Sequence, residues 1–480
     1  MLILIVGYIT AQQPLLAGAI ALVVPALLAV LFLPDICTLF VLFTMYSNLA
    51  TVATQFHNVP FIIGISIPLL LAIPIAHYLV IQRQSLIITP VMCLVLLFYV
   101  VQIIGTALSR DVPQATENLI RYLSEGLLLY TLVFNAVRTW ATMRKILWVL
   151  LLAGAMLGSF GFHQMLTGAY DNDYGGLAQV SNAAFSTGEE TLYGEVMQPR
   201  LAGSIGEQNR FAQTMLMLVP LGIFLLLSER NWFARGAVAI LTVFTMIAVV
   251  GTFSRGAALG FMGMLLTMVF MRYIKVKWFV TIFLSALLLL VLFPQYGNRV
   301  LRLQGIMGLV AEQENITEET KPDGSLQGRA NEALTAALVF ADYPVFGVGP
   351  QMFPTFYQEY SKEVGYKRTD GQERQAHNLY LGIAADNGLV GLTCFLGIIG
   401  LTLHSLAKVR RQYLLRRPEL AHTATAFILA IIIYLITGIG AHFTYIRFFW
   451  MIMALANSVC YIAQVESLNQ RPWTYRSHNI

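Results

Sequence analysis

Stretches of about twenty consecutive apolar residues recur along nearly the whole chain, and an α-helix needs this length to cross the hydrocarbon core of a bilayer. Charged residues make up only 11% of the sequence, whereas a soluble domain carries about 25%. The sequence also lacks the short alternating strand segments that a membrane β-barrel requires. We therefore predict an all-α polytopic integral membrane protein surrounded by membrane lipids.

The apolar runs divide into about 12–14 expected transmembrane helices. The apolar start at 2–12 has no basic region and no following cleavage site, so we expect it to stay in the membrane rather than to be removed as a signal peptide. The expected spans are residues 14–33, 36–56, 61–81, 89–108, 118–137, 145–165, 208–228, 236–252, 256–271, 278–295, 381–406, 422–441 and 446–465.

Short loops rich in Lys and Arg indicate which way the chain is inserted, because such loops stay in the cytoplasm. Four of them are separated from one another by even numbers of expected spans, which places them on one side. These loops hold Arg138, Arg144 and Lys145; Arg230 and Arg235; Arg272, Lys275 and Lys277; and residues 408–417. The protein is thus expected in the inner (cytoplasmic) membrane of a bacterium, with its long loops on the periplasmic face.

This orientation divides the chain into alternating membrane and loop segments. The segments are N-terminal helices at 1–165, a first periplasmic loop at 166–205, central helices at 206–295, a large periplasmic loop at 296–380, C-terminal helices at 381–465 and a cytoplasmic tail at 466–480. We interpret 166–205 as a plain surface loop. Since ATP is absent from the periplasm, chemistry at these loops must use a substrate that is already activated.

The charge and cysteine patterns exclude several other functions. The net charge of +5 lies in the short loops that set the topology, so no nucleic-acid partner is expected. The four cysteines all fall inside apolar runs without paired spacing, which argues against disulfides and a metal site. We expect neither a metal ion nor another cofactor. The cysteines are Cys37, Cys93, Cys394 and Cys460.

Two arginines are candidates for binding an anionic substrate. Arg255, in "TFSRGA", lies in the hairpin between two spans, where an arginine is costly unless it is paired or faces water. Arg329, in "SLQGRANEAL", opens an expected helix in the large loop. Each alone is also explained as a snorkelling or solvent-facing side chain. The apolar face of the second helix would hold Ala330, Leu334, Ala337 and Leu338.

A histidine stands where the large loop returns to the membrane, in "RQAHNLYLGIAADNGLVGL". His377 precedes the expected span together with Asn378, and the positive end of that helix favours the neutral imidazole that a general base needs. Gly388 and Gly391 are expected to allow close approach of another helix. A structural histidine at the interface is the alternative.

Two further polar groups lie at the same face. "QPRLAGSIGEQNRFAQ" brings Arg200, Asn209 and Arg210 to the start of a span, and an ordinary polar helix start would explain them equally. "GAHFTYIRFFW" places His442 and Arg447 at the turn between the last two spans.

These side chains together suggest one kind of chemistry. Guanidinium groups bind phosphate oxygens in pairs of parallel hydrogen bonds. A diphosphate on a long lipid would reach them between the helices, and a neutral histidine could deprotonate an incoming hydroxyl. The residues therefore point to a transferase that uses a lipid-diphosphate donor.

Four segments also resemble the O-antigen ligase and O-antigen polymerase superfamily. They are, in chain order, "RLAGSIGEQNRFA", "TFSRGA", "GRANEAL…DYPVFGVGP" and "HNLYLGIAADNGLVGL", and they cover about residues 195–395. The N-terminal third is similar to the family only in its hydropathy, and the loop at 166–205 matches no motif.

The resemblance implies a GT-C-type, metal-independent and inverting glycosyltransferase. The donor would be a glycan on undecaprenyl diphosphate, and the acceptor a hydroxyl of lipid A-core, of a lipid-linked repeat or of another molecule. Carried over by motif, Arg255 and Arg329 hold the diphosphate, with Arg200 assisting, and His377 activates the acceptor.

Several alternatives stay open. The motifs do not separate a ligase, which joins a finished glycan to lipid A-core, from a polymerase, which extends lipid-linked repeats, or from an enzyme that glycosylates a protein. A transporter or flippase would need ionisable residues near mid-membrane, and a structural subunit of an export complex would need no shared pocket. Glu117, Arg121 and Glu125 form the chief charged cluster in a span, which we interpret as a salt bridge.

Overall fold

The computed structural model describes residues 34–191, 194–292, 324–362, 364, 374–441 and 446–469. Within these ranges eight helices are long and apolar enough to cross a membrane, and a pair bent by 58° would make a ninth. Two shorter apolar helices accompany them. The prediction of an all-α polytopic membrane protein is confirmed, while the expected span at 14–33 lies outside the described residues.

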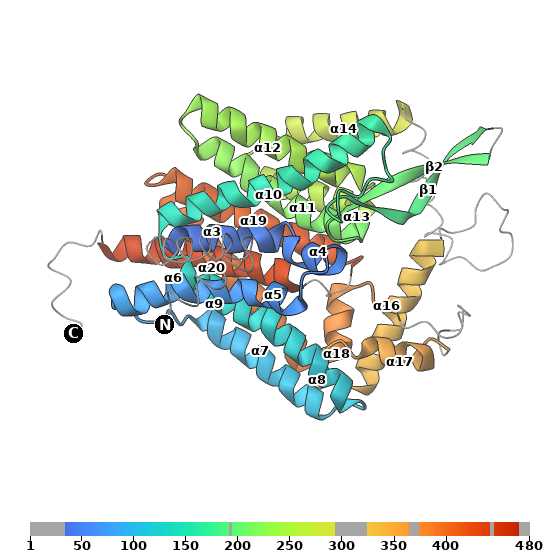
Figure 1. The fold of residues 1–480 in the computed structure, drawn as a ribbon, viewed down its shortest axis with the longest axis horizontal. Helices are drawn as coiled ribbons and strands as arrows, with labels where there is room; N and C mark the ends of the chain where they lie inside the picture. The colour runs from blue at the N-terminus through green and yellow to red at the C-terminus, as the bar shows by residue number, and fades with distance from the viewer. Residues whose placement is uncertain are drawn as a thin grey trace, which may run out of the picture.

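Several of the helices before residue 168 follow one another with a change of helix type between them (Figure 1). In chain order they are α3 (Pro34–Tyr46), α4 (Leu49–Phe56), α5 (Phe61–Ser66), η1 (Ile67–Leu71), α6 (Ala72–Ala76), η2 (His77–Ile81), α7 (Pro90–Ala107), α8 (Val112–Tyr122), η3 (Leu123–Leu128), α9 (Leu129–Ala136) and α10 (Trp140–Thr167). In α8 and η3, Arg121 lies 3.7 Å from Glu125, which agrees with the expected salt bridge.

The helices from residue 208 onward supply the centre of the bundle. They include α11 (Gln208–Ser228), α12 (Trp232–Gly251), α13 (Arg255–Phe270), α14 (Val276–Leu292), α18 (Leu379–Tyr413), α19 (Pro418–Gly438) and α20 (Ile446–Asn469). In each of α11, α19 and α20, 78% of an apolar stretch of 18 residues is buried inside the protein, against 22% in α12. The first three therefore form the core, and α12 presents most of its surface to the surroundings.

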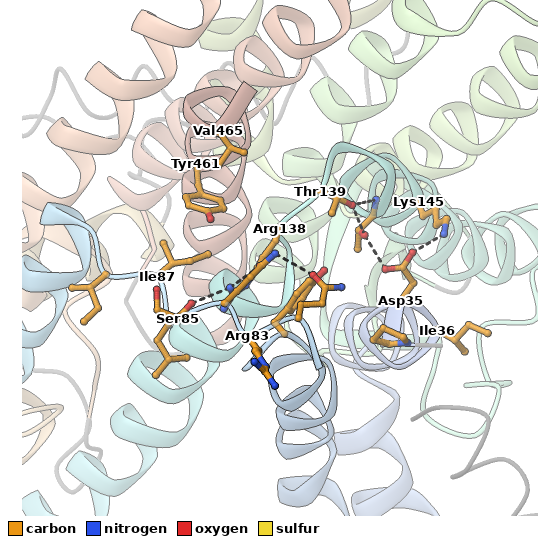
Figure 2. A pocket seen from close by; sticks show the side chains of 17 residues that line it. Asp35, Ile36, Arg83, Ser85, Ile87, Arg138, Thr139, Lys145, Tyr461 and Val465 are labelled. Atoms are coloured by element: carbon orange, nitrogen blue, oxygen red, sulfur yellow. Dashed lines mark hydrogen bonds and ion pairs between the residues drawn. The ribbon is translucent and has the colours of Figure 1, made fainter. Parts of the chain in front are cut away.

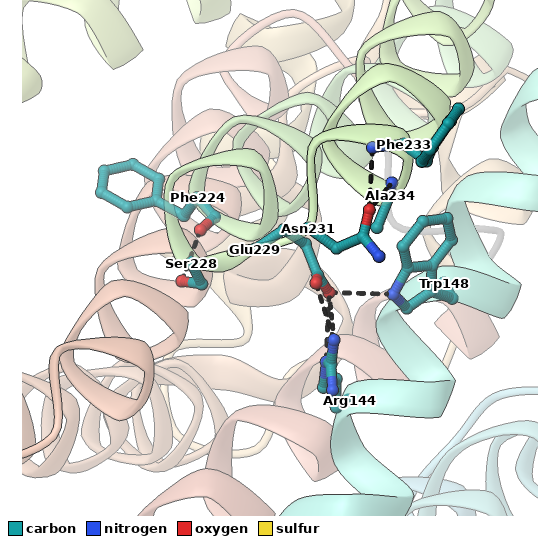
Figure 3. A network of polar contacts seen from close by, with 8 residues as sticks. All are labelled: Arg144, Trp148, Phe224, Ser228, Glu229, Asn231, Phe233 and Ala234. Carbon is teal, nitrogen blue, oxygen red and sulfur yellow. Dashed lines mark hydrogen bonds and ion pairs between the residues drawn. The ribbon is translucent and has the colours of Figure 1, made fainter.

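The four basic loops lie together at one end of the bundle, which we call the basic end. Arg144 forms an ion pair of 2.6 Å with Glu229 (Figure 3), and Arg410 donates a hydrogen bond of 3.0 Å to the carbonyl of Met271. Ser228 and His422 join these two pairs of loops at 3.1 Å. The contacts agree with the prediction that these loops share one side of the membrane.

The other end, which we call the hairpin end, carries β1 (Gln179–Thr191), β2 (Gly194–Gly203), α16 (Gly324–Asp342) and α17 (Phe353–Tyr360) (Figure 1). The loop expected at 166–205 contains a hairpin, in which β1 and β2 pair antiparallel. Leu201 fastens this hairpin to the bundle: it is buried, and its Cδ1 fills the space left by the missing side chains of Gly161 and Gly251. Such a contact between distant segments has no local sequence signal.

Helix α18 is broken at Gly388, so the expected span at 381–406 is not one straight helix. The turn "DYPVFGVGP" supplies the hydrogen bonds that the break leaves open: the amide of Leu389 donates to Pro344 O at 2.7 Å, and the amide of Gly349 donates to Asp386 O at 2.9 Å. A Cβ on Gly388 would lie 2.2 Å from the carbonyl oxygen of Val345. Gly388 thus admits a turn, not the neighbouring helix that we expected.

A small separate core holds α16, α17, this turn and the start of α18 together. The pKa of the Tyr360 phenol is raised chiefly by burial, so it keeps its proton and donates to Asp342 at 2.7 Å, which fixes the end of α16 to α17. The buried members of this core are Ala115, Ala336, Val339, Val348, Met352, Phe353, Phe356, Tyr357, Tyr360, Ala376 and Ala385.

Candidate active site

The last turn of α19 is the landmark around which the candidate residues gather. A Cβ on Gly440, two residues beyond α19, would lie 3.5 Å from Arg329 Nη1. A Cβ on Gly438 would lie 2.8 Å from the side chain of Leu379, the first residue of α18. These close approaches bring Arg329 and the start of α18 to the same end of one central helix.

Helix α13 packs along α19 as well. A Cβ on Gly260 would lie 2.7 Å from the Thr437 side chain. The two helices are antiparallel, since α13 ends and α19 begins at the basic end. Arg255 begins α13 and therefore lies at the hairpin end, on the level of Gly440.

The turn before α13 fixes the start of that helix. Ser254 is its N-cap: its hydroxyl accepts from the amide of Ala257 at 3.4 Å and donates to Asn209 Oδ1 at 3.0 Å. The preceding residue, Phe253, has a φ of +51°, a left-handed conformation that costs a residue with a side chain free energy. The tightness of this turn sets the half-buried Arg255 at the helix start.

Arg200 supports the same turn. Its Nε donates to the carbonyl of Thr252 at 2.9 Å, and its Nη2 lies 3.4 Å from Asn209 Oδ1. The side chain is buried. Arg200 therefore ties β2 to the chain just before Arg255.

Arg210 is buried one turn into α11. Its Nη1 donates to Gln213 Oε1 at 3.1 Å, and Gln213 in turn donates to the hydroxyl of Thr437 at 2.7 Å. Glu207 caps the helix by accepting from the amides of Asn209 and Arg210. These contacts link the start of α11 to the last turn of α19.

His377 lies directly before α18 in a left-handed backbone conformation, with φ +44°. Its Nδ1 lies 2.8 Å from Glu332 Oε2 and 3.0 Å from the carbonyl oxygen of Gln375. Both neighbours are acceptors, so Nδ1 carries a proton and donates it toward them. The side chain is 31% exposed, which leaves the imidazole accessible.

Asn378 is the N-cap of α18. Its Oδ1 accepts from the amides of Tyr380 at 3.0 Å and Leu381 at 3.1 Å. The cap ends the loop and starts the helix immediately after His377. Asn378 therefore fixes the backbone next to His377. Its side-chain oxygen is already engaged in the two hydrogen bonds of the cap.

Glu332 is the polar residue that sequence reasoning missed. Its carboxylate is buried and contacts both His377 and Arg374, whose Nη1 lies 3.2 Å from Oε1. The available signal was its place three residues after Arg329, on the same side of a helix. Apolar periodicity gave the opposite face instead.

The predicted apolar face of α16 is only partly buried against the protein. Leu334 is 56% exposed and Ala330 is exposed, whereas the buried positions of that stretch include three polar side chains. The buried side of α16 faces the polar start of α18, where Glu332 contacts His377. The buried positions are Asn331, Glu332, Thr335, Ala336 and Val339.

Arg447 belongs to a neighbouring contact group. Its guanidinium donates to Asn48 Oδ1 and, at 3.1 Å, to the hydroxyl of Thr51, while Asn48 donates to Ser204 O at 2.5 Å. Arg447 therefore joins α20 to the bent α3–α4 pair and to the end of the hairpin. His442 lies outside the described residues.

A cavity of about 1130 Å³ opens at the basic end, away from all these residues (Figure 2). Arg138 lines it and donates to Ser85 O at 3.0 Å, and Lys145 pairs with Asp35 at 2.6 Å. Among the described residues, no group of three or more His, Cys, Asp or Glu side chains could hold a metal ion. The candidate site therefore lies at the hairpin end, where Arg329, the start of α13 and the start of α18 meet the last turn of α19.

A family model described as O-antigen ligase matches residues 237–396, about a third of the chain. No curated protein matches the chain. The matched part runs from α12 to the middle of α18 and includes Arg255, Arg329, Glu332 and His377. Residues 237–396, which carry the candidate site, are therefore similar to the O-antigen ligase family.

Proposed function

We propose that this protein is a glycosyltransferase that moves a glycan from undecaprenyl diphosphate to an acceptor hydroxyl. Its family supports a function in polysaccharide assembly, with a lipid-linked glycan and a polysaccharide acceptor as substrates in general. We assign the hairpin end to the periplasmic face of the inner membrane, because loops rich in Lys and Arg stay in the cytoplasm.

One observation carries the proposal: two arginines and a histidine from three distant segments converge on the end of α19. Arg329 approaches Gly440, the helix that begins at Arg255 packs on Thr437, and the helix that follows His377 packs on Gly438. Two guanidinium groups and an imidazole at the same end of one helix suit a diphosphate leaving group and a hydroxyl nucleophile.

In the proposed reaction, His377 Nε2 takes the proton of the acceptor hydroxyl while the hydroxyl oxygen attacks the anomeric carbon. The bond from that carbon to the diphosphate oxygen breaks, and undecaprenyl diphosphate leaves with the electron pair. Attack and departure occur on opposite faces of the sugar, so the anomeric configuration inverts. The imidazolium then releases its proton to solvent.

Arg255 and Arg329 hold the diphosphate and stabilise the charge that grows on it as the bond breaks. Hydrogen bonds to charged groups contribute about 1.5–3 kcal/mol each. We assign Arg200 a supporting role, since its guanidinium already binds Thr252 O and Asn209 in the turn before Arg255.

A reconstituted transfer assay tests the proposal. Purified protein and the His377→Ala variant are incubated with an undecaprenyl-diphosphate glycan and either lipid A-core or a second lipid-linked repeat. Glycan on lipid A-core identifies a ligase, which the family description favours, and lengthened lipid-linked chains identify a polymerase. Loss of transfer with retained donor binding in His377→Ala is the expected result. Donor movement across the membrane without any transfer would refute the enzyme and favour a flippase.

A further inference from the structure

We propose that Glu332 is a positioning residue for His377, with Arg374 balancing its charge; this inference rests on the proposed function. The three side chains form a connected group. Glu332 Oε2 lies 2.8 Å from His377 Nδ1, and Glu332 Oε1 lies 3.2 Å from Arg374 Nη1. Each carboxylate oxygen thus has its own partner.

The burial of Glu332 indicates a positional requirement. Its side chain is 2% exposed, and removing a carboxylate from water costs several kcal/mol unless it is well paired. On the same helix, Leu334 is 56% exposed. The buried side of α16 therefore holds the carboxylate, and the leucine lies on the other side of the helix.

Glu332 determines which nitrogen of His377 can react. As the acceptor for Nδ1–H, it holds the ring in the tautomer whose Nε2 is unprotonated. It also holds the ring in one orientation, on a backbone that is itself constrained at φ +44°. Nε2 is therefore presented as the base before any substrate binds.

The charges around the imidazole oppose one another. When Nε2 takes a proton, the imidazolium lies against the Glu332 carboxylate and is stabilised by it. The guanidinium of Arg374, across the same carboxylate, limits this effect. On the loop side the carbonyl oxygen of Gln375 lies 3.0 Å from Nδ1, and Arg329 lies on the helix that carries Glu332.

The tests are Glu332→Gln and Arg374→Gln in the full-length protein, with pH–rate profiles in the transfer assay. In Glu332→Gln we expect kcat to fall at least about ten-fold, within the range that general base catalysis supplies. The KM for the donor should stay within about two-fold, because ground-state donor binding is untouched. The acid limb of the profile should move to lower pH in Glu332→Gln and to higher pH in Arg374→Gln.

Two controls separate positioning from a structural role. Glu359 lies on neighbouring α17 and forms an exposed ion pair with Arg110. Glu359→Gln removes this pair and should leave kcat and the pH–rate profile unchanged. In a His377→Ala background, which still binds the donor, Glu332→Gln should leave the donor affinity unchanged, because the carboxylate acts on the base and not on the donor.

The outcomes are distinguishable from failure of the proposed function. Wild-type protein that transfers no glycan would remove the proposed function itself. Normal kcat in Glu332→Gln, acid limbs that move in the same direction in both variants, or a loss of donor affinity in the double variant would overturn the positioning role while leaving the transferase standing. If the Glu332→Gln protein does not fold, Arg374→Gln alone still tests the positioning role. The acid limb of its pH–rate profile must then move to higher pH.

Discussion

Replacing Gly388 by alanine should separate the loop that carries the candidate base from the membrane helix behind it. Gly388 has φ +65° and ψ −170°, a region that essentially only glycine occupies, and an alanine there costs about 1–3 kcal/mol in backbone strain. The new Cβ would lie 2.2 Å from the carbonyl oxygen of Val345. That carbonyl must therefore move away.

The movement also affects two hydrogen bonds across the break. These run from Leu389 N to Pro344 O at 2.7 Å and from Val390 N to Val345 O at 3.3 Å, and each contributes about 0.5–1.5 kcal/mol. Strain and lost bonds together amount to about 2–6 kcal/mol. We expect a lower thermal midpoint in detergent and loss of transfer.

Gly400→Ala is the matched control. Gly400 lies in the same helix, and a Cβ there would have no atom within 4 Å, so alanine should leave stability and transfer unchanged or slightly improve stability. A Gly388→Ala protein with the wild-type thermal midpoint and transfer rate would refute the reasoning, because the break would then not hold the loop in place.

Three further predictions concern the site and its support. Arg255→Ala and Arg329→Ala should each lower kcat at least about ten-fold, since one hydrogen bond to a charged group contributes about 1.5–3 kcal/mol; steady-state rates with the lipid-linked donor check this, and near-normal turnover in either variant would remove that arginine from the diphosphate site. His377→Ala should bind the donor with unchanged affinity but transfer nothing, which equilibrium binding beside the assay measures. Leu201→Ala should destabilise the protein by about 2–5 kcal/mol by leaving a cavity, seen as a lower thermal midpoint and faster proteolysis within the hairpin.

The sequence was sufficient for the fold class because apolar length is a direct requirement of the bilayer. It also sufficed for the common side of the basic loops, since Arg144 and Arg410 obey a rule about charge rather than about packing. Helix breaks were harder. Gly388 carried a signal for a special backbone, but small residues serve both helix packing and helix breaking, and only the contact with Val345 decides between them.

The candidate site was accessible in part for a similar reason. Arginine and histidine at a membrane face are conspicuous in a sequence, whereas Glu332 looked like an ordinary polar residue of an exposed helix. Its burial depends on Arg374 and His377, more than forty positions away in the chain. Periodicity assumes that the apolar face is the buried one, and α16 departs from that assumption at the place where a charge is required.

The break in α18 has a consequence for how the protein is made. Just before Gly388 the carbonyls of Ala385 and Asp386 accept from the amides of Val348 and Gly349 in the turn, in place of partners further along the helix. Turn and half-helix are therefore one folding unit, although they are separated in the chain by α17. That unit can form only after the segment beyond His377 has left the ribosome, so the candidate base takes its position after the helices up to α17 have been made.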